Sequence, residues 1–173
     1  MKMLMGVALG AVLLAGAARA EVTDKSAAGF EVVETASIAA PVGKVWDALM
    51  RPAKWWSNTH SWSGDAKNLY FDPSGCFCET LKRGAVRHMT IIYNDGATTL
   101  RLNGGLGPMQ FTGAGGNLGI VLKPAGTGTQ LTLTYDVGGY AKGGVENLAA
   151  PVDMVLGEQV ARLAKYVETG KPE

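Results

Sequence analysis

The feature that most constrains the fold is a run of alternating strand patterns followed by one long amphipathic helix. In 117–123 and 130–137, apolar residues alternate with other residues, as in strands with one buried and one exposed face. The Pro- and Gly-containing segment 124–128 between them is typical of a hairpin loop. Apolar residues then recur at helical spacing over 151–168, enough for a helix of about 27 Å. This order predicts an antiparallel sheet covered by a single helix.

Earlier segments extend the same pattern. An extended segment at 30–38 precedes Pro41, which opens a helix, and Pro52 opens a second short helix carrying Trp55 and Trp56. Four further strands are predicted, at 66–71, 76–81, 86–93 and 98–103. We therefore expect an α+β fold, in which a curved antiparallel sheet wraps around the C-terminal helix and two short helices follow the first strand. Such a half-closed sheet forms a natural pocket.

Residues 1–20 have the pattern of a signal peptide. Lys2 is followed by the uncharged apolar stretch 3–16, and Ala18-Arg19-Ala20 gives the small-x-small motif before a cleavage site. The apolar stretch is shorter than the roughly 20 residues that a bilayer span needs. We predict cleavage after Ala20, a periplasmic or secreted protein, and no membrane span in the mature chain. The predicted organisation is then a polar tether at 21–29, a folded domain at 30–169 and a tail at 170–173.

The charge balance argues against a nucleic-acid partner. The chain has 16 Lys and Arg against 15 Asp and Glu, and removal of Lys2 and Arg19 with the leader changes its net charge from +1 to −1. The Gly-rich segment 103–108 lacks the Gly-Lys-Ser/Thr ending of a phosphate-binding loop. It is interpreted as a mobile loop with bulges at a sheet edge, and no cofactor is predicted. The sequence does not indicate an oligomeric state.

Cys76 and Cys78 are the only cysteines and are one residue apart. In a regular strand such residues lie about 6.6 Å apart with parallel side chains, so a disulfide would require a local bend. We expect two reduced, half-buried cysteines. A zinc site made by this pair with His60 and His88 is the less favoured alternative, because Cys-x-Cys is an unusual zinc chelate. No metal site is predicted.

Glu79 and His88 form the most informative polar pair. If residues 82–85 make a turn, Glu79 lies opposite His88 on adjacent strands. One interpretation is a salt bridge at the surface or rim of the pocket. The other is a dyad for acid–base chemistry or ligand orientation near neutral pH. The alternation is not clean on either face, so the sequence does not identify the inward one.

The segment 39–49 resembles the "aP-x-x-x-VW-x-a-L" opening of the START-like (SRPBCC) superfamily. This group includes the polyketide cyclase/dehydrase-like proteins, the Hsp90-ATPase-activator-like proteins and the birch-allergen-like lipid binders. Trp55-Trp56, the strand start at 75–79 and the terminal helix fit the same architecture, so the resemblance covers roughly 30–168. It implies the helix-grip (Bet v 1-like) fold, and it does not choose among the functions found on that fold.

The expected function is that of an exported protein binding a small hydrophobic or amphipathic molecule between the sheet and the C-terminal helix. Glu79 and His88 would provide the polar recognition. The alternatives are a cyclase/dehydratase-type enzyme with Glu79 and His88 as its acid–base pair, or a periplasmic protein-interaction module. The expected ligand-binding residues are Trp55, Trp56, Phe77, Glu79, His88, Leu100, Leu102, Leu133, Tyr135, Val152, Val155, Leu156 and Val160.

Overall fold

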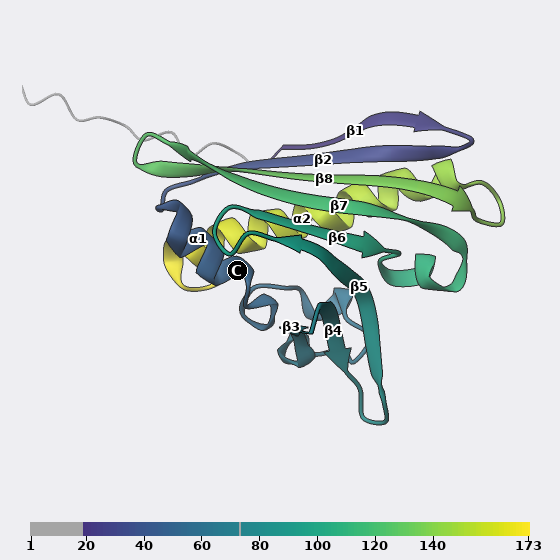
Figure 1. The fold of residues 1–173 in the computed structure, drawn as a ribbon, viewed down its shortest axis with the longest axis horizontal. Helices are drawn as coiled ribbons and strands as arrows, with labels where there is room; N and C mark the ends of the chain where they lie inside the picture. Colours follow the sequence, from purple (N-terminus) through teal and green to yellow (C-terminus); the bar gives the residue numbers. More distant parts are fainter. Residues whose placement is uncertain (1–18, 73) are drawn as a thin grey trace, which may run out of the picture.

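The computed structural model describes residues 19–72 and 74–173, and within them the strands form one eight-stranded antiparallel sheet (Figure 1). The strand order is β1-β2-β8-β7-β6-β5-β4-β3. The strands are β1 (Arg19–Ser26), β2 (Gly29–Ile38), β3 (Leu69–Asp72), β4 (Cys76–Thr80), β5 (Ala85–Asn94), β6 (Thr99–Gly104), β7 (Gly113–Ala125) and β8 (Gly128–Tyr140). The predicted leader at 1–20 lies outside the described residues, except that its last two residues begin β1.

Two α-helices and several short 3-10 turns complete the chain. The first helix begins directly after Pro41, whereas the second predicted helix is only a single 3-10 turn that starts at Pro52. The C-terminal helix ends at Gly170, whose φ of +80° is readily adopted by glycine. Within the described residues, no helix combines the length and the hydropathy needed to cross a membrane. The helical elements are α1 (Val42–Leu49), η1 (Pro52–Lys54), η2 (Asn58–His60), η3 (Ala66–Asn68), η4 (Gly107–Phe111), η5 (Val145–Leu148) and α2 (Ala149–Thr169).

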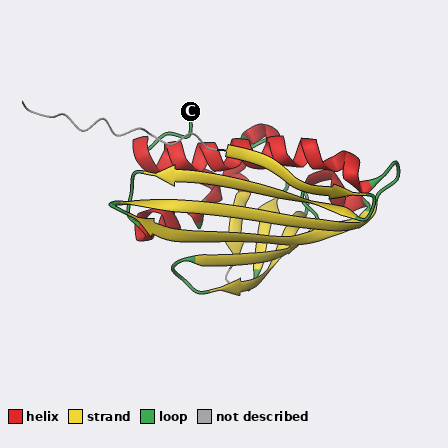
Figure 2. Cartoon of the chain, turned by 90° about the horizontal axis from the view of Figure 1, so that it is seen from above, coloured by secondary structure: helices red, strands yellow, loops and turns green. Residues whose placement is uncertain are grey.

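The long helix α2 lies along one face of the curved sheet, as Figure 2 shows. It packs on β1, β2 and α1. The strands β5, β4 and β3 form the opposite end of the sheet (Figure 1). The alternating inward residues of β2 and β8 and the apolar stripe of α2 form the core, with Val32, Leu131 and Leu163 almost completely buried. The predicted fold class is confirmed: the sheet is antiparallel and curved, and one long helix covers it.

The N-terminal segment 21–29 differs from its prediction as a polar tether. Most of it belongs to β1, an edge strand that pairs antiparallel with β2 and turns into it where Ser26 lies opposite Gly29. In this polar strand, Val22 packs against the core, opposite the buried Val32. The segment therefore lacks the apolar alternation that identifies the other strands, and it is ordered as a strand by its pairing with β2.

The Gly-rich region 113–116 lengthens the strand that was predicted for 117–123. It lies within β7, which pairs with β8 along 13 residues in an unbroken register from Gly113 opposite Tyr140 to Ala125 opposite Gly128. Gly116 brings the two backbones together so closely that a Cβ built on it would lie 1.7 Å from the carbonyl oxygen of Asp136. Glycine is required there because the neighbouring strand occupies the space of a side chain.

The two cysteines correct another prediction. Cys76 and Cys78 are joined by a disulfide, and their Cα atoms are 5.5 Å apart. The pairing of β4 with β5 shifts between Phe77, which lies opposite Met89, and Cys78, which lies opposite Arg87. This irregularity falls within the Cys-x-Cys segment. The expectation of two reduced cysteines assumed a regular strand, and it is wrong because the strand pair is bulged here.

Candidate functional site

A cleft of about 420 Å³ opens beside the first half of α2. One wall is the loop around η2, the second is the segment leading into η4, and the third is the start of α2 with η5 before it. His88 lines it from β5. Apolar side chains dominate the walls, among them Trp56, Trp62, Leu106, Pro108, Met109, Leu148, Pro151, Val152, Val155 and Leu156.

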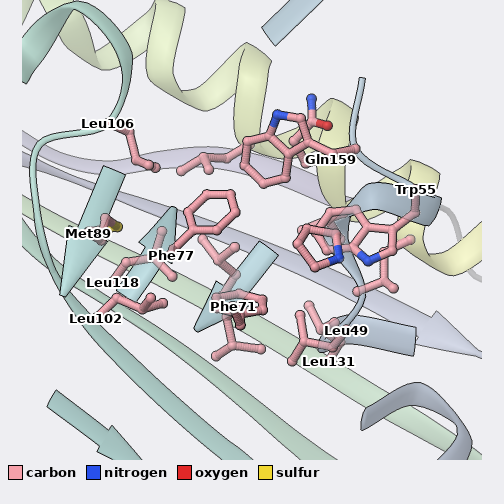
Figure 3. A pocket seen from close by; sticks show the side chains of 17 residues that line it. Leu49, Trp55, Phe71, Phe77, Met89, Leu102, Leu106, Leu118, Leu131 and Gln159 are labelled. Atoms are coloured by element: carbon pink, nitrogen blue, oxygen red, sulfur yellow. The ribbon is translucent and has the colours of Figure 1, made fainter. Parts of the chain in front are cut away.

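A second, much smaller cavity of about 40 Å³ lies deeper, between the sheet and α2. Figure 3 shows Phe77, Met89 and Leu118 approaching it from the strands and Trp55 and Gln159 from the helical side. This volume suffices for one or two water molecules and not for an organic ligand. Because Trp56, Leu106 and Leu156 line both spaces, they separate a filled core from the open cleft.

The predicted ligand-binding residues therefore divide into three groups, and their binding role stays a prediction. The cleft is lined by Trp56, His88, Val152, Val155 and Leu156. The inner cavity is lined by Trp55, Trp56, Phe77, Leu102, Leu133, Leu156 and Val160. Neither space is lined by Glu79, Leu100 or Tyr135, and all three side chains are fully buried. Sequence reasoning missed the contribution of Leu106 and Met109, which lie in and after the segment predicted to be a mobile loop.

Tyr135 does not line the cleft, but its hydroxyl group fixes the wall that carries Leu106. Its hydroxyl donates a hydrogen bond to the carbonyl oxygen of Gly104 at 2.8 Å and accepts one from the backbone N–H of Leu106 at 3.3 Å. Burial raises the pKa of this hydroxyl to about 12, so it stays protonated and can donate at neutral pH. The segment carrying Leu106 is thereby fixed to β8, and it is better described as anchored than as mobile.

The opposite wall is fixed to α2. The side-chain oxygen of Gln159 accepts a hydrogen bond from the backbone N–H of Ser57 at 2.9 Å, and Arg162 donates through Nε to the carbonyl oxygen of Trp55 at 2.9 Å. At the edge of the cleft, His60 Nε2 and Glu158 Oε2 are 2.9 Å apart. These three contacts hold the tryptophan-bearing loop against the helix, so two of the cleft walls are bound to each other directly.

Glu79 and His88 interact inside the protein. His88 Nε2 and Glu79 Oε2 are 2.9 Å apart, with side-chain exposures of 6% and 0%. The interpretation as a surface or rim salt bridge is therefore wrong. Their register also differs from the prediction, because Glu79 lies opposite Val86 and His88 is the extra residue at the bulge. The bulge allows the consecutive residues His88 and Met89 both to be buried.

The Glu79 carboxylate accepts hydrogen bonds from three donors. Besides His88, it accepts hydrogen bonds from the backbone N–H groups of Trp62 at 3.0 Å and Ser63 at 2.6 Å. Burial alone would raise the pKa of Glu79, but the hydrogen bonds from Ser63, Trp62 and His88 outweigh burial and hold the pKa below its usual value. Glu79 is therefore ionised at neutral pH. It fixes the backbone next to Trp62 and orients the imidazole.

The protonation state of His88 follows from its two neighbours. The Gln110 side-chain nitrogen, which can only donate, lies 3.4 Å from His88 Nδ1. We therefore assign the proton to Nε2, which donates to Glu79, and leave Nδ1 as an acceptor. Burial lowers the pKa of His88, although Glu79 partly opposes this effect, so the ring is neutral at pH 7. The dyad thus places an oriented, neutral imidazole at an apolar cleft.

The side chains considered for zinc do not come together. Both cysteines are in the disulfide, and His60 and His88 make separate contacts with carboxylates. In the part of the chain that the structure describes, no group of three or more His, Cys, Asp or Glu side chains is arranged to hold a metal ion. The groups that the described residues bring to this site are an imidazole, a carboxylate and an apolar surface.

Comparison with known proteins gives the fold. No family model and no curated protein matches the chain. CalU16 from Micromonospora echinospora is 15% identical with a TM-score of 0.52, covering 91% of this chain and 88% of its own. DynU16, from the dynemicin biosynthetic locus, is 23% identical with a TM-score of 0.57, covering 82% and 48%. Aha1 from Colwellia psychrerythraea is 16% identical with a TM-score of 0.55, covering 82% and 98%.

These solved structures share the sheet and the long C-terminal helix of the present chain. The chain accordingly has the helix-grip fold, and the fold that the resemblance in its sequence implies is confirmed. Identities below one quarter carry no activity or ligand from those proteins to this one.

Proposed function

We propose that this is an exported binding protein that holds a small hydrophobic or amphipathic molecule in the cleft beside α2. The observation that carries the proposal is the cleft of about 420 Å³ with apolar walls and one oriented imidazole. Its volume lies within the range of about 300–1,000 Å³ that is usual for small-molecule sites. The inner cavity of about 40 Å³ is a separate space and is too small for such a ligand.

The polar group in the cleft favours an amphipathic ligand. His88 Nδ1 is the acceptor end of a ring whose Nε2–H is held by Glu79, so a ligand hydroxyl that replaces the long 3.4 Å contact from Gln110 would find an oriented acceptor there. The rest of the ligand would lie against Trp56, Val152 and Val155. Export is supported by the leader pattern at 1–20 and by the disulfide, since disulfides persist mainly in oxidising compartments.

Blocking the cleft should remove binding. Val155→Trp places a large ring in the cleft, and we expect it to weaken the binding of a fluorescent fatty-acid probe by about tenfold or more. Met154→Trp is the matched control, because the neighbouring side chain is 67% exposed and does not line the cleft. Probe titration and native mass spectrometry would measure both variants. Equal affinity in the two variants, or no probe binding by the wild-type protein, would contradict the proposal.

A cyclase/dehydratase-type enzyme is the second candidate. The observation in its favour is the neutral His88, oriented by an ionised carboxylate as a general base requires. DynU16 comes from a biosynthetic locus, which makes this alternative worth testing here. An interaction module is less favoured, because a cleft of about 420 Å³ is large enough to hold a small molecule.

His88→Gln separates the binding protein from the enzyme. The glutamine retains an N–H for Glu79 and removes the basic nitrogen. For a binding protein we expect a several-fold loss of affinity for a probe with a hydroxyl head group and little change for a plain hydrocarbon. For an enzyme, turnover of a polyketide-like substrate should fall about 100-fold or more while binding persists. Affinity unchanged for every probe would remove His88 from the site.

A further inference from the structure

Glu34 is a buried carboxylate that the cleft does not use. It lies on β2 among inward-facing apolar residues, is 0% exposed, and has no hydrogen-bond partner for either carboxylate oxygen among the described residues. An isolated buried charge is costly, so such a group normally has a partner or holds a proton. Burial, with a further contribution from Asp153, raises the pKa of Glu34 to about 8.

The titratable groups that face Glu34 are themselves acidic. Asp153 on α2 is close enough to act on Glu34, and one of its own oxygens, Oδ1, is buried without a partner. Burial raises the pKa of Asp153, and Glu21 on β1 raises it further. The junction of β1, β2 and α2 therefore collects three acids, one of them fully buried and unpaired. Among the side chains that the structure describes, none of these three acids forms an ion pair.

The β1 register places the predicted cleavage site directly beside this group. Ala20 lies opposite Glu34, and Glu21 lies opposite Val33. Hydrolysis of the Ala20–Glu21 peptide bond by a signal peptidase would consume one water, release residues 1–20 with a carboxylate on Ala20, and leave an α-ammonium on Glu21. Opposite Cα atoms in an antiparallel pair are about 4.5–5.5 Å apart. The new amine is therefore within reach of the Glu34 side chain.

We propose that leader removal after Ala20 supplies the missing cation, the α-ammonium of Glu21 forming an ion pair with Glu34 and Asp153. This inference rests on the export and cleavage in the proposed function and is independent of any ligand. Before cleavage, no side chain among the described residues supplies Glu34 with a counter-ion. After cleavage, the end of β1 is held to both β2 and α2. Proteolytic maturation would then complete the packing of the edge strand.

The test uses protein secreted from the full-length gene, with mass spectrometry of the N-terminus. Cyanate near neutral pH carbamylates the α-amine ahead of the lysines and makes it neutral, because an α-amine has the lower pKa. We expect carbamylation to be several-fold slower in the wild-type protein than in Glu34→Gln, since the ion pair protects the protonated amine. The carbamylated wild-type protein should melt about 5 °C lower, while carbamylation of Glu34→Gln should change its Tm by about 1 °C or less.

Three results would overturn the ion pair. They are an N-terminus other than Glu21, equal carbamylation rates in the two proteins, and equal losses of Tm on carbamylation. Carbamylation adds the same bulk to both proteins. A difference between them in the change of Tm is therefore due to the lost positive charge of the α-amine. If Glu34→Gln does not fold, the same comparison is made with Asp153→Asn, which changes the partly exposed partner. Carbamylation must then lower the Tm of Asp153→Asn by less than it lowers the Tm of the wild-type protein. Probe binding to the cleft is measured separately, so failure of the ligand proposal does not affect this outcome.

Discussion

Replacing Glu79 with alanine should lower the free energy of unfolding by about 3–5 kcal/mol, because it removes the acceptor of a buried charged network. The backbone N–H groups of Trp62 and Ser63 and the Nε2–H of His88 would all lose their partner. No water reaches the carboxylate, whose side chain is 0% exposed. Urea denaturation at neutral pH would measure the loss.

The pH dependence of this effect has a defined sign. The folded-state pKa of Glu79 lies below its usual value, so its ionised form contributes stability above the pKa of the unfolded chain. That contribution is lost as the pH falls through the lower, folded-state pKa. The gap between wild type and Glu79→Ala should therefore narrow in acid. Glu79→Gln keeps one acceptor oxygen and should lose less; a loss below about 1 kcal/mol for Glu79→Ala would show that the network is not a major source of stability.

Gly116→Ala should be at least as damaging, with a loss of about 3 kcal/mol or more. The added Cβ would lie 1.7 Å from the carbonyl oxygen of Asp136 and 2.7 Å from its carbonyl carbon. Both atoms are backbone, so no side-chain rotation relieves the collision. The β7–β8 pairing must separate locally, and hydrogen bonds of the ladder are lost with it.

Gly119→Ala is the matched control on the same strand. A Cβ built on Gly119 meets no atom within 4 Å, and its φ is not positive. The exchange should be neutral or should stabilise the protein by up to about 1 kcal/mol, because alanine restricts the unfolded chain. Thermal and urea unfolding of both variants would measure the contrast. Similar losses of unfolding free energy in the two variants would contradict this prediction. They would mean that any side chain at these positions of β7 is costly, and that the close approach of β8 is not the reason for glycine at position 116.

Periodic patterns predicted the elements that have two distinct faces. The alternation in β7 and β8 and the apolar stripe of α2 identified the sheet, the covering helix and the fold class. An alternation with a period of two indicates on which face of the sheet a side chain lies, but it does not indicate whether that side chain is in the core or at a ligand-accessible surface. Leu100 and Tyr135 were therefore placed on a ligand surface, although both are 0% exposed within the core.

Features that depend on distant pairing were not accessible in this way. β1 is ordered by β2 although its own sequence is polar, and two of the three walls of the cleft are loops and short turns without periodic patterns. The contact between Glu79 and His88 was predicted with the two residues opposite each other in a regular hairpin, whereas in the structure Glu79 lies opposite Val86 and His88 reaches it diagonally from the bulge. The same bulge invalidates the regular spacing on which the reduced cysteines were predicted.

The division between a filled core and an open cleft has a kinetic consequence. The larger space lies outside the sheet–helix core, bordered by the partly exposed Trp62 and its neighbour Phe111, which is 78% exposed. A guest molecule can therefore enter and depart without separating α2 from the strands. Its residence time is set by its own contacts with the walls, and exchange does not wait for a slow opening of the protein. The proposed binding protein would then load and release its ligand rapidly while its fold stays intact.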